Sequence, residues 1–268
     1  MRRFFSCLVS VSAIIALALI SFLGVQAWIE THHGQSLVTH ATVGIDHYKL
    51  PTFSGSLDDS GYDVSFPQCQ SVLSNKSVGF VIIGLNHGKP LTANPCFNDQ
   101  WRWARQHAAA AVYINVSDPG QLTATSRGNQ IADDTISKLT NAGVANDVPV
   151  WLDVETHNSW SDTDRAVTML NTVIKELHSH GHPVGIYSTP VEWFTITMDA
   201  NVTVPTWVAI GKYSSISAGV AGAKNTCSSS SFGGRSPGIV QFVAKSDGVW
   251  RDRNIMCTSP AGLVARPQ

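Results

Sequence analysis

The sequence predicts an α/β fold, an irregular TIM-type (β/α) barrel preceded by an N-terminal signal or anchor helix. Eight short apolar segments have the length and the β-branched composition of buried strands. Helical segments separate the early strands, whereas no convincing helix separates the last three. Eight strands of this kind suit a closed barrel better than an open sheet.

The strand segments are recognised because their apolar residues form unbroken runs that do not alternate with polar residues. Runs of this kind are typical of a parallel sheet that is buried on both faces. The predicted strands are 62–65, 79–84, 110–114, 148–152, 184–187, 206–210, 238–242 and 249–252.

Apolar residues at helical spacing predict helices at 97–107 and 131–142 and a third one that starts at Ser161. The third is the clearest, because Ser161 begins a capping pattern with Asp164 three residues later and Gly181 closes the helix. Residues 190–197 are predicted as a short fourth helix.

The N-terminus predicts export from the cytoplasm. Arg2 and Arg3 precede an apolar run over 4–25, and residues 25–27 form a small-residue cleavage pattern. A run of this length can also span a bilayer, so 1–27 is predicted as a signal peptide or a membrane anchor. Either outcome makes the rest of the chain secreted or extracytoplasmic. The predicted segments that follow are a weakly packed stalk at 28–60, the barrel at 61–258 and a C-terminal tail at 259–268.

Cysteine usage agrees with an oxidising compartment. Outside the leader the chain has four cysteines, which allow three pairings. We favour Cys69–Cys96 and Cys227–Cys257, since each pair joins neighbouring loops of the predicted barrel. The spacing lacks the short C-x-x-C pairs of a zinc site, so no metal is predicted.

Charge and motifs narrow the range of partners. The formal net charge is −1 and 14% of the residues are charged, so the chain lacks the basic field that draws in nucleic acid. No phosphate-binding glycine loop is present, and no cofactor is predicted. We expect a monomer that contacts a membrane only through its N-terminal segment.

The acids at the strand ends carry the prediction of function. Asp153 and Glu155 lie two residues apart at the end of one strand, so their side chains share one side of the barrel mouth. Crowded carboxyls move their pKa values apart, and glycoside cleavage needs one protonated and one ionised group. Asp63 in the first strand and Asp252 near the end of the last strand join them. The alternative is a structural acid pair, bonded to backbone or arginine, or a site that has lost its activity.

Six ordered motifs resemble the glycoside hydrolase family 25 lysozymes, the muramidases of the Chalaropsis type. The likeness is closer to secreted actinobacterial glycoside-hydrolase-like proteins related to them. The motifs are Gly-Tyr-Asp-Val-Ser-Phe-Pro-Gln at 61–68, Gly-Phe-Val-Ile-Ile at 79–83, Val-Trp-Leu-Asp-Val-Glu at 150–155, Gly-Ile-Tyr-Ser at 185–188, Gly-Ile-Val-Gln-Phe at 238–242 and Asp-Arg-Asn at 252–254.

The resemblance implies a barrel of about five β/α units followed by three strands. It implies that Glu155 donates the proton and that Asp153 orients and stabilises the intermediate formed by the substrate's acetamido group. Asp63 and Asp252 become supporting acids. The implied substrate is peptidoglycan, cut between muramic acid and glucosamine units with net retention.

Two stretches depart from the family pattern. Family members commonly read Arg-Ala-Thr-Glu-Gly after the second strand, where this chain has Gly-Leu-Asn-His-Gly at 84–88. The third strand continues as Tyr-Ile-Asn-Val-Ser-Asp-Pro-Gly at 113–120, without the usual aromatic pair. The predicted function is therefore an extracytoplasmic glycoside hydrolase acting on cell-wall polysaccharide, and the alternative is a noncatalytic cell-wall glycan-binding barrel.

Further side chains near strand ends are predicted to contact the sugar. Aromatic faces can stack on sugar rings, although buried aromatic residues are more often part of the core. Amides can bond hydroxyl groups, although barrel amides are as often satisfied internally. The candidates are Tyr187, Trp207, Gln241, Asn115, His87 and His157.

Overall fold

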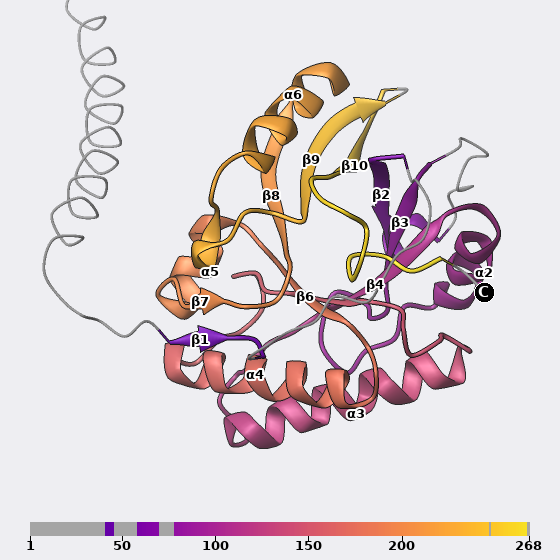
Figure 1. Cartoon of the computed structure of the whole chain (residues 1–268). Helices are drawn as coiled ribbons and strands as arrows, with labels where there is room; N and C mark the ends of the chain where they lie inside the picture. Colours follow the sequence, from indigo (N-terminus) through magenta and orange to yellow (C-terminus); the bar gives the residue numbers. More distant parts are fainter. Residues whose placement is uncertain (1–40, 46–57, 70–77, 247, 267–268) are drawn as a thin grey trace, which may run out of the picture. The chain divides into compact units, whose positions relative to one another are not determined.

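The computed structural model describes residues 41–45, 58–69, 78–246 and 248–266 (Figure 1). The chain divides into two compact units, Met1–Thr39 and His40–Gln268, and every described residue belongs to the second. The predicted leader at 1–27 and most of the predicted stalk lie outside the described residues.

A closed barrel of eight strands forms the centre of the described domain, as predicted. Neighbouring strands are parallel from β2 to β9, in the order β2-β3-β4-β5-β6-β8-β9. β10 closes the ring between β9 and β2 and is antiparallel to both. The strands are β2 (Ser60–Val64), β3 (Phe80–Gly84), β4 (Ala109–Asn115), β5 (Val150–Asp153), β6 (Val184–Ser188), β8 (Thr206–Tyr213), β9 (Ile239–Ser246) and β10 (Val249–Met256).

Helices follow five of the parallel strands in the described part of the chain. The bounds of α2 and α5 are those predicted, whereas α3 begins seven residues earlier than expected, with Thr123 as its cap. α4 is capped by Asp162, one residue after the predicted Ser161. The helices are α2 (Phe97–His107), α3 (Ala124–Asn141), α4 (Thr163–Ser179), α5 (Pro190–Thr197) and α6 (Ile216–Cys227), with short 3-10 turns η1 (Phe66–Gln68) and η2 (Phe232–Gly234).

Two expectations about the last strands are wrong. Helix α6 lies between β8 and β9, where no helix was predicted, because its two internal glycines conceal the helical pattern. The last strand was predicted to be parallel, but a tight turn at Gly248 (φ 79°) folds β10 back against β9. Asp252 therefore lies within an antiparallel strand rather than at the carboxyl end of a parallel one.

Part of the predicted stalk is packed onto the domain. Residues Thr42–Val43 form β1, which pairs in parallel with β7 (Asn201–Val202), and Val43 is fully buried. The Asn171 side chain holds this segment by accepting from the Gly44 amide and donating to the Thr42 carbonyl, both at 2.8 Å. The expectation of weak packing is thus wrong for this stretch.

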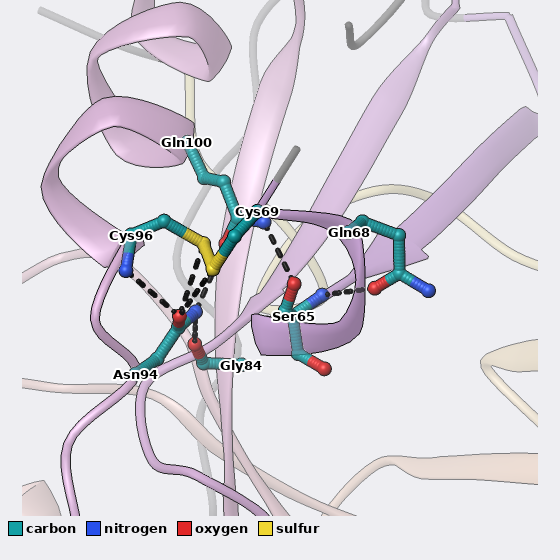
Figure 2. Close-up of a disulfide and its surroundings, with 7 residues drawn as sticks. All are labelled: Ser65, Gln68, Cys69, Gly84, Asn94, Cys96 and Gln100. Carbon is teal, nitrogen blue, oxygen red and sulfur yellow. Dashed lines mark hydrogen bonds between the residues drawn. A yellow bond between two sulfur atoms is a disulfide. The ribbon is translucent and has the colours of Figure 1, made fainter. Parts of the chain in front are cut away.

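Two disulfides join loops to helix ends, and both predicted pairings are present. Cys69–Cys96 ties the turn after η1 to the start of α2, beside Asn94 (Figure 2). The Asn94 side chain donates to the Gly84 carbonyl at 2.7 Å and accepts from the Cys96 amide at 3.1 Å. Cys227–Cys257 ties the end of α6 to the end of β10.

The C-terminal segment covers the barrel end that faces away from the carboxyl ends of the parallel strands. Leu263 and Val264 are buried with the aromatic residues of the barrel interior. Ala265 exchanges two backbone hydrogen bonds of 2.8 Å with Ala110, at the start of β4. None of the helices in the described part of the chain is long and apolar enough to cross a bilayer.

Candidate active site

A pocket of about 180 Å³ opens at the carboxyl ends of the parallel strands. The four acids singled out in the sequence converge there, although they come from β2, the β5 end and β10. Its lining residues are Asp63, Tyr113, Asp153, Glu155, Tyr187, Trp207, Gln241 and Asp252.

Asp153 and Glu155 differ in their access to solvent. Asp153 ends β5 and is 5% exposed, whereas the Glu155 side chain lies just beyond the strand and is 24% exposed. The Asp153 Oδ2 atom accepts a short hydrogen bond of 2.5 Å from the Asn115 side-chain amide on β4. The other oxygen of Asp153, Oδ1, is buried and has no hydrogen-bond partner among the described residues. The outer acid thus faces the opening and the inner acid is held behind it.

Burial raises the pKa of both members of this pair. The pKa of Asp153 lies well above its ordinary value, through burial and through the negative charge of Glu155. Burial also raises the pKa of Glu155, while His157 opposes that rise. The negative charge of Glu192 contributes to both rises. Both carboxyls therefore keep a proton to a higher pH than free carboxyls do.

Asp63 is held by amides from two other strands. Its Oδ1 atom accepts from the side chains of Gln241, at 3.0 Å, and Asn254, at 2.7 Å. Gln241 accepts in turn from the Tyr187 hydroxyl at 2.9 Å, and Asn254 accepts from the Trp207 indole at 2.8 Å. This network fixes the two aromatic rings of the pocket as well as the acid.

Burial raises the pKa of Asp63 to about 7, and the nearby charge of Asp252 contributes to that rise. Burial also raises the pKa of Asp252. At neutral pH the pocket therefore carries fewer negative charges than its four carboxyls would have in water.

Only some of the predicted sugar-contact residues line the pocket. Tyr187, Trp207 and Gln241 line the pocket, and Asn115 lies behind it, bonded to Asp153. The His157 side chain is 53% exposed, and its Nδ1 atom lies 3.0 Å from the Glu155 Oε2 atom. His87 does not line the pocket; its ring packs on Phe66 with the centroids 3.7 Å apart.

Gly84, the first residue of the altered segment at 84–88, is packed closely against β4. A side chain at Gly84 would begin 2.7 Å from the Tyr113 ring and from the Ser65 Cβ atom. Tyr113, which was not singled out in the sequence, therefore fills the space above Gly84 and lines the pocket. Its place two residues before Asn115 on the same strand was the available signal.

Three more polar residues that shape the site were missed. The Asn86 side chain donates to the Asn115 carbonyl at 3.0 Å and accepts from the Asn115 amide at 3.1 Å, which extends the sheet by one bonded pair. Asn254 belongs to the Asp63 network. Glu192, in the first turn of α5, accepts from the Thr156 hydroxyl at 3.0 Å, and its charge raises the pKa of Glu155.

No group of three or more His, Cys, Asp or Glu side chains is arranged to hold a metal ion in the described ranges. The groups that line the pocket are carboxyls, one amide and aromatic rings.

Residues 57–233 match the model of a family described as lysozyme-like protein 1, and the chain belongs to this lysozyme-like family. No protein of curated function is similar enough to count as a match.

Several solved structures have a similar fold. A muramidase from Acremonium alcalophilum is 16% identical with a TM-score of 0.54, and the alignment covers 74% of this chain and 92% of that one. A family 25 glycosyl hydrolase from Bacillus anthracis is 16% identical, with a TM-score of 0.52 and coverage of 80% and 94%. A lysozyme from Streptomyces coelicolor is 18% identical, with a TM-score of 0.51 and coverage of 79% and 99%. The family match confirms the predicted relationship to lysozymes, and the solved structures show that the chain shares its fold with a family 25 glycosyl hydrolase.

Proposed function

We propose that this chain is an extracytoplasmic glycoside hydrolase that cleaves cell-wall polysaccharide by acid catalysis through Asp153 and Glu155. The observation that carries the proposal is the convergence of four carboxyls, two tyrosines and an indole on one open pocket. Solved proteins of similar fold are muramidases and lysozymes, which supports peptidoglycan as the substrate class.

Glu155 is the proposed proton donor, because it is the more exposed acid and borders the opening. It protonates the oxygen of the glycosidic bond while the bond from that oxygen to the sugar C1 atom breaks. Its raised pKa keeps it protonated at a higher pH than a free glutamate, as a general acid requires. In the second half of the reaction, the Glu155 carboxylate takes a proton from the attacking water.

Asp153 is the proposed partner of the substrate's acetamido group. The Asp153 carboxylate accepts a hydrogen bond from the sugar N–H, and Glu155 is then the protonated member of the pair. The acetamido oxygen then bonds to C1 as the leaving oxygen departs, and Asp153 stabilises the positive charge that develops. Asn115 keeps Asp153 in position through its amide bond.

Amide substitution of the pair tests the proposal. Glu155→Gln and Asp153→Asn should each lower the release of reducing ends from purified cell walls by about 100-fold or more, the order of a lost general acid. Asp133→Asn, on the exposed face of α3, is the matched control and should keep wild-type activity. Full activity in both pair variants would refute the assignment, with folding checked by thermal melting.

The second candidate is a noncatalytic barrel that binds cell-wall glycan. It is favoured by Gly84 and His87, which stand where family members commonly have arginine and glutamate, and by the placement of His87 outside the pocket. Cosedimentation with purified walls distinguishes the two candidates when reducing ends are measured in the same samples. Binding without release would support this candidate.

The remaining proposals concern compartment and assembly. Two disulfides fit an oxidising, extracytoplasmic compartment. We propose that 1–27 directs or anchors the chain there, that 28–60 links it to the barrel at 61–258, and that the domain works as a monomer on cell-wall carbohydrate without a cofactor or nucleic acid. The segment at 259–268 follows the predicted barrel in sequence, but part of it is packed into the domain and closes one end of the barrel.

A further inference from the structure

Three side chains, Lys212, Lys245 and Trp250, form what we call the Lys–Trp cluster. They lie on β8, β9 and β10, the strands that lead away from the pocket. The Lys212 and Lys245 Nζ atoms lie 5.6 Å and 5.3 Å from the centroid of the Trp250 ring. Trp250 is nonetheless 46% exposed. No carboxylate of the described residues forms an ion pair with either lysine. Asp247 lies outside the described residues.

Strand register places this Lys–Trp cluster on the same wall as the pocket. Trp250, Asp252 and Asn254 alternate along β10 and so share one face of the strand. Asp252 lines the pocket, and Asn254 donates to Asp63 inside it. Lys245 is paired directly with Trp250 across the hairpin and therefore points to the same side. The Cα atom of Trp250 is about 7 Å along the strand from that of Asp252, at two residues of extended rise.

The hairpin extends this wall beyond the barrel rim. Within the described ranges, β10 pairs with β2 only through Asn254 and Ile255, so no described residue forms a ladder with residues 249–253 on that side. Figure 1 shows β9 and β10 rising past the end of β2. The cluster is thus open to solvent and continuous with the pocket.

The cluster carries two positive charges, whereas the pocket is lined by carboxyls. The pocket carboxyls repel an anion, whereas two ammonium groups attract one, and carboxylates make the stronger, charge-assisted hydrogen bonds with such donors. An exposed indole offers a flat apolar face against which the C–H face of a sugar ring can pack.

We propose that the Lys–Trp cluster is a binding subsite for a carboxylate-bearing unit of the same glycan chain whose glycosidic bond lies in the acid pocket. This inference rests on the proposed function, since it assumes that the pocket receives a glycan. It assigns recognition of the anionic substituent to Lys212 and Lys245 and recognition of the sugar ring to Trp250.

Binding to insoluble peptidoglycan tests the subsite independently of cleavage. Variants are made in a Glu155→Gln background and cosedimented with native peptidoglycan and with the same material after amidation of its carboxyls. The double variant Lys212→Gln, Lys245→Gln should bind native peptidoglycan about three- to tenfold more weakly, the range of two exposed ion pairs. It should bind the amidated material as well as its parent does. Added salt should erase the difference on native material.

Two controls make the result specific. Lys175→Gln, Lys224→Gln removes the same charge from the exposed outer faces of α4 and α6 and should leave binding unchanged. Trp250→Ala should weaken binding to native and amidated material alike, by about fivefold, since stacking does not depend on the carboxylate. Equal binding of the two double variants to native peptidoglycan would overturn the proposal. Loss of binding in the cluster variant, together with no reducing ends from the wild type, would support the subsite and refute the hydrolase.

Discussion

At the scale of single residues, burial decides how the pocket titrates. Four carboxyls lie in one small space, and burial is the largest cause of the raised pKa at each of them. Neighbouring charges then distinguish the members of the pair, since Glu155 raises the pKa of Asp153 whereas His157 opposes the rise at Glu155. The division of roles thus depends on depth as well as on sequence spacing.

The raised pKa of Asp63 predicts a pH dependence of stability. The folded chain holds a proton at Asp63 up to about pH 7, whereas the unfolded chain releases it near 3.8, so the folded state binds more protons in between. The free energy of unfolding should therefore fall as pH rises from about 4 to 7. Asp63→Asn keeps an oxygen acceptor for Gln241 and Asn254 and should flatten that fall.

Thermal melting of both proteins at intervals from pH 4 to pH 8 measures this effect. The melting temperature of Asp63→Asn, taken relative to that of the wild type at the same pH, should increase as pH rises. Parallel curves for the two proteins would show that Asp63 has an ordinary pKa in the fold.

The sequence predicted which acids meet, but not what holds them. Asp153 and Glu155 follow from a two-residue spacing at a strand end, which needs no knowledge of neighbouring strands. Asn254, Tyr113 and Asn86 act through partners on other strands. Those partners depend on the register between strands, which a single sequence does not specify.

At the scale of elements, α6 shows how close packing can hide a helix in a sequence. A Cβ atom at Gly219 would lie 2.1 Å from the Phe242 ring, and one at Gly222 would lie 2.4 Å from the Tyr213 hydroxyl. The two glycines let the helix lie directly on aromatic side chains of β8 and β9. Glycine also has a low intrinsic helix propensity, so the sequence pattern predicted no helix there.

Gly219→Ala should destabilise the domain even though alanine is the better helix former. The added methyl group meets a buried ring, and overpacking of this kind costs about 1–3 kcal/mol. Chemical denaturation measures the loss in free energy of unfolding. In a Phe242→Leu background the same substitution should cost less, because the ring atoms that it meets are gone. An equal cost in both backgrounds would show that Phe242 is not the obstacle.

The direction of the last strand could not be predicted from its apolar pattern alone. An apolar run fits a parallel or an antiparallel neighbour equally well, and the connection at 247–248 is too short for any crossover to a parallel strand. That short connection was the available signal. Asp252 nevertheless lines the pocket, because an antiparallel strand also passes the rim of the barrel.

At the scale of the whole domain, the barrel is closed at one end by its C-terminal segment and open at the other. Leu263 and Val264 fill the closed end, and the Trp151 indole donates to the Leu263 carbonyl at 3.2 Å. The acid pocket occupies the opposite end. The C-terminal segment that packs into the barrel and the acid pocket therefore lie at opposite ends of the barrel axis.

Truncation after Pro260 should lower stability while leaving the pocket chemistry intact. It removes two buried side chains, each worth about 1.5–3 kcal/mol of burial, and the backbone pairing with Ala110. The free energy of unfolding should fall by about 3 kcal/mol or more. Leu263→Ala, with the chain at full length, should produce part of the same loss. An unchanged denaturation midpoint in the truncated protein would contradict the packing described for this segment.

The most direct measurement of the central claim is the proton NMR spectrum of peptidoglycan during digestion by the wild-type protein. The mechanism proposed for the four-carboxyl pocket, with assistance by the acetamido group, predicts new reducing ends on muramic acid units, which appear first in the β-anomeric form if configuration is retained. The absence of new reducing ends, or their first appearance in the α-anomeric form, would contradict the account.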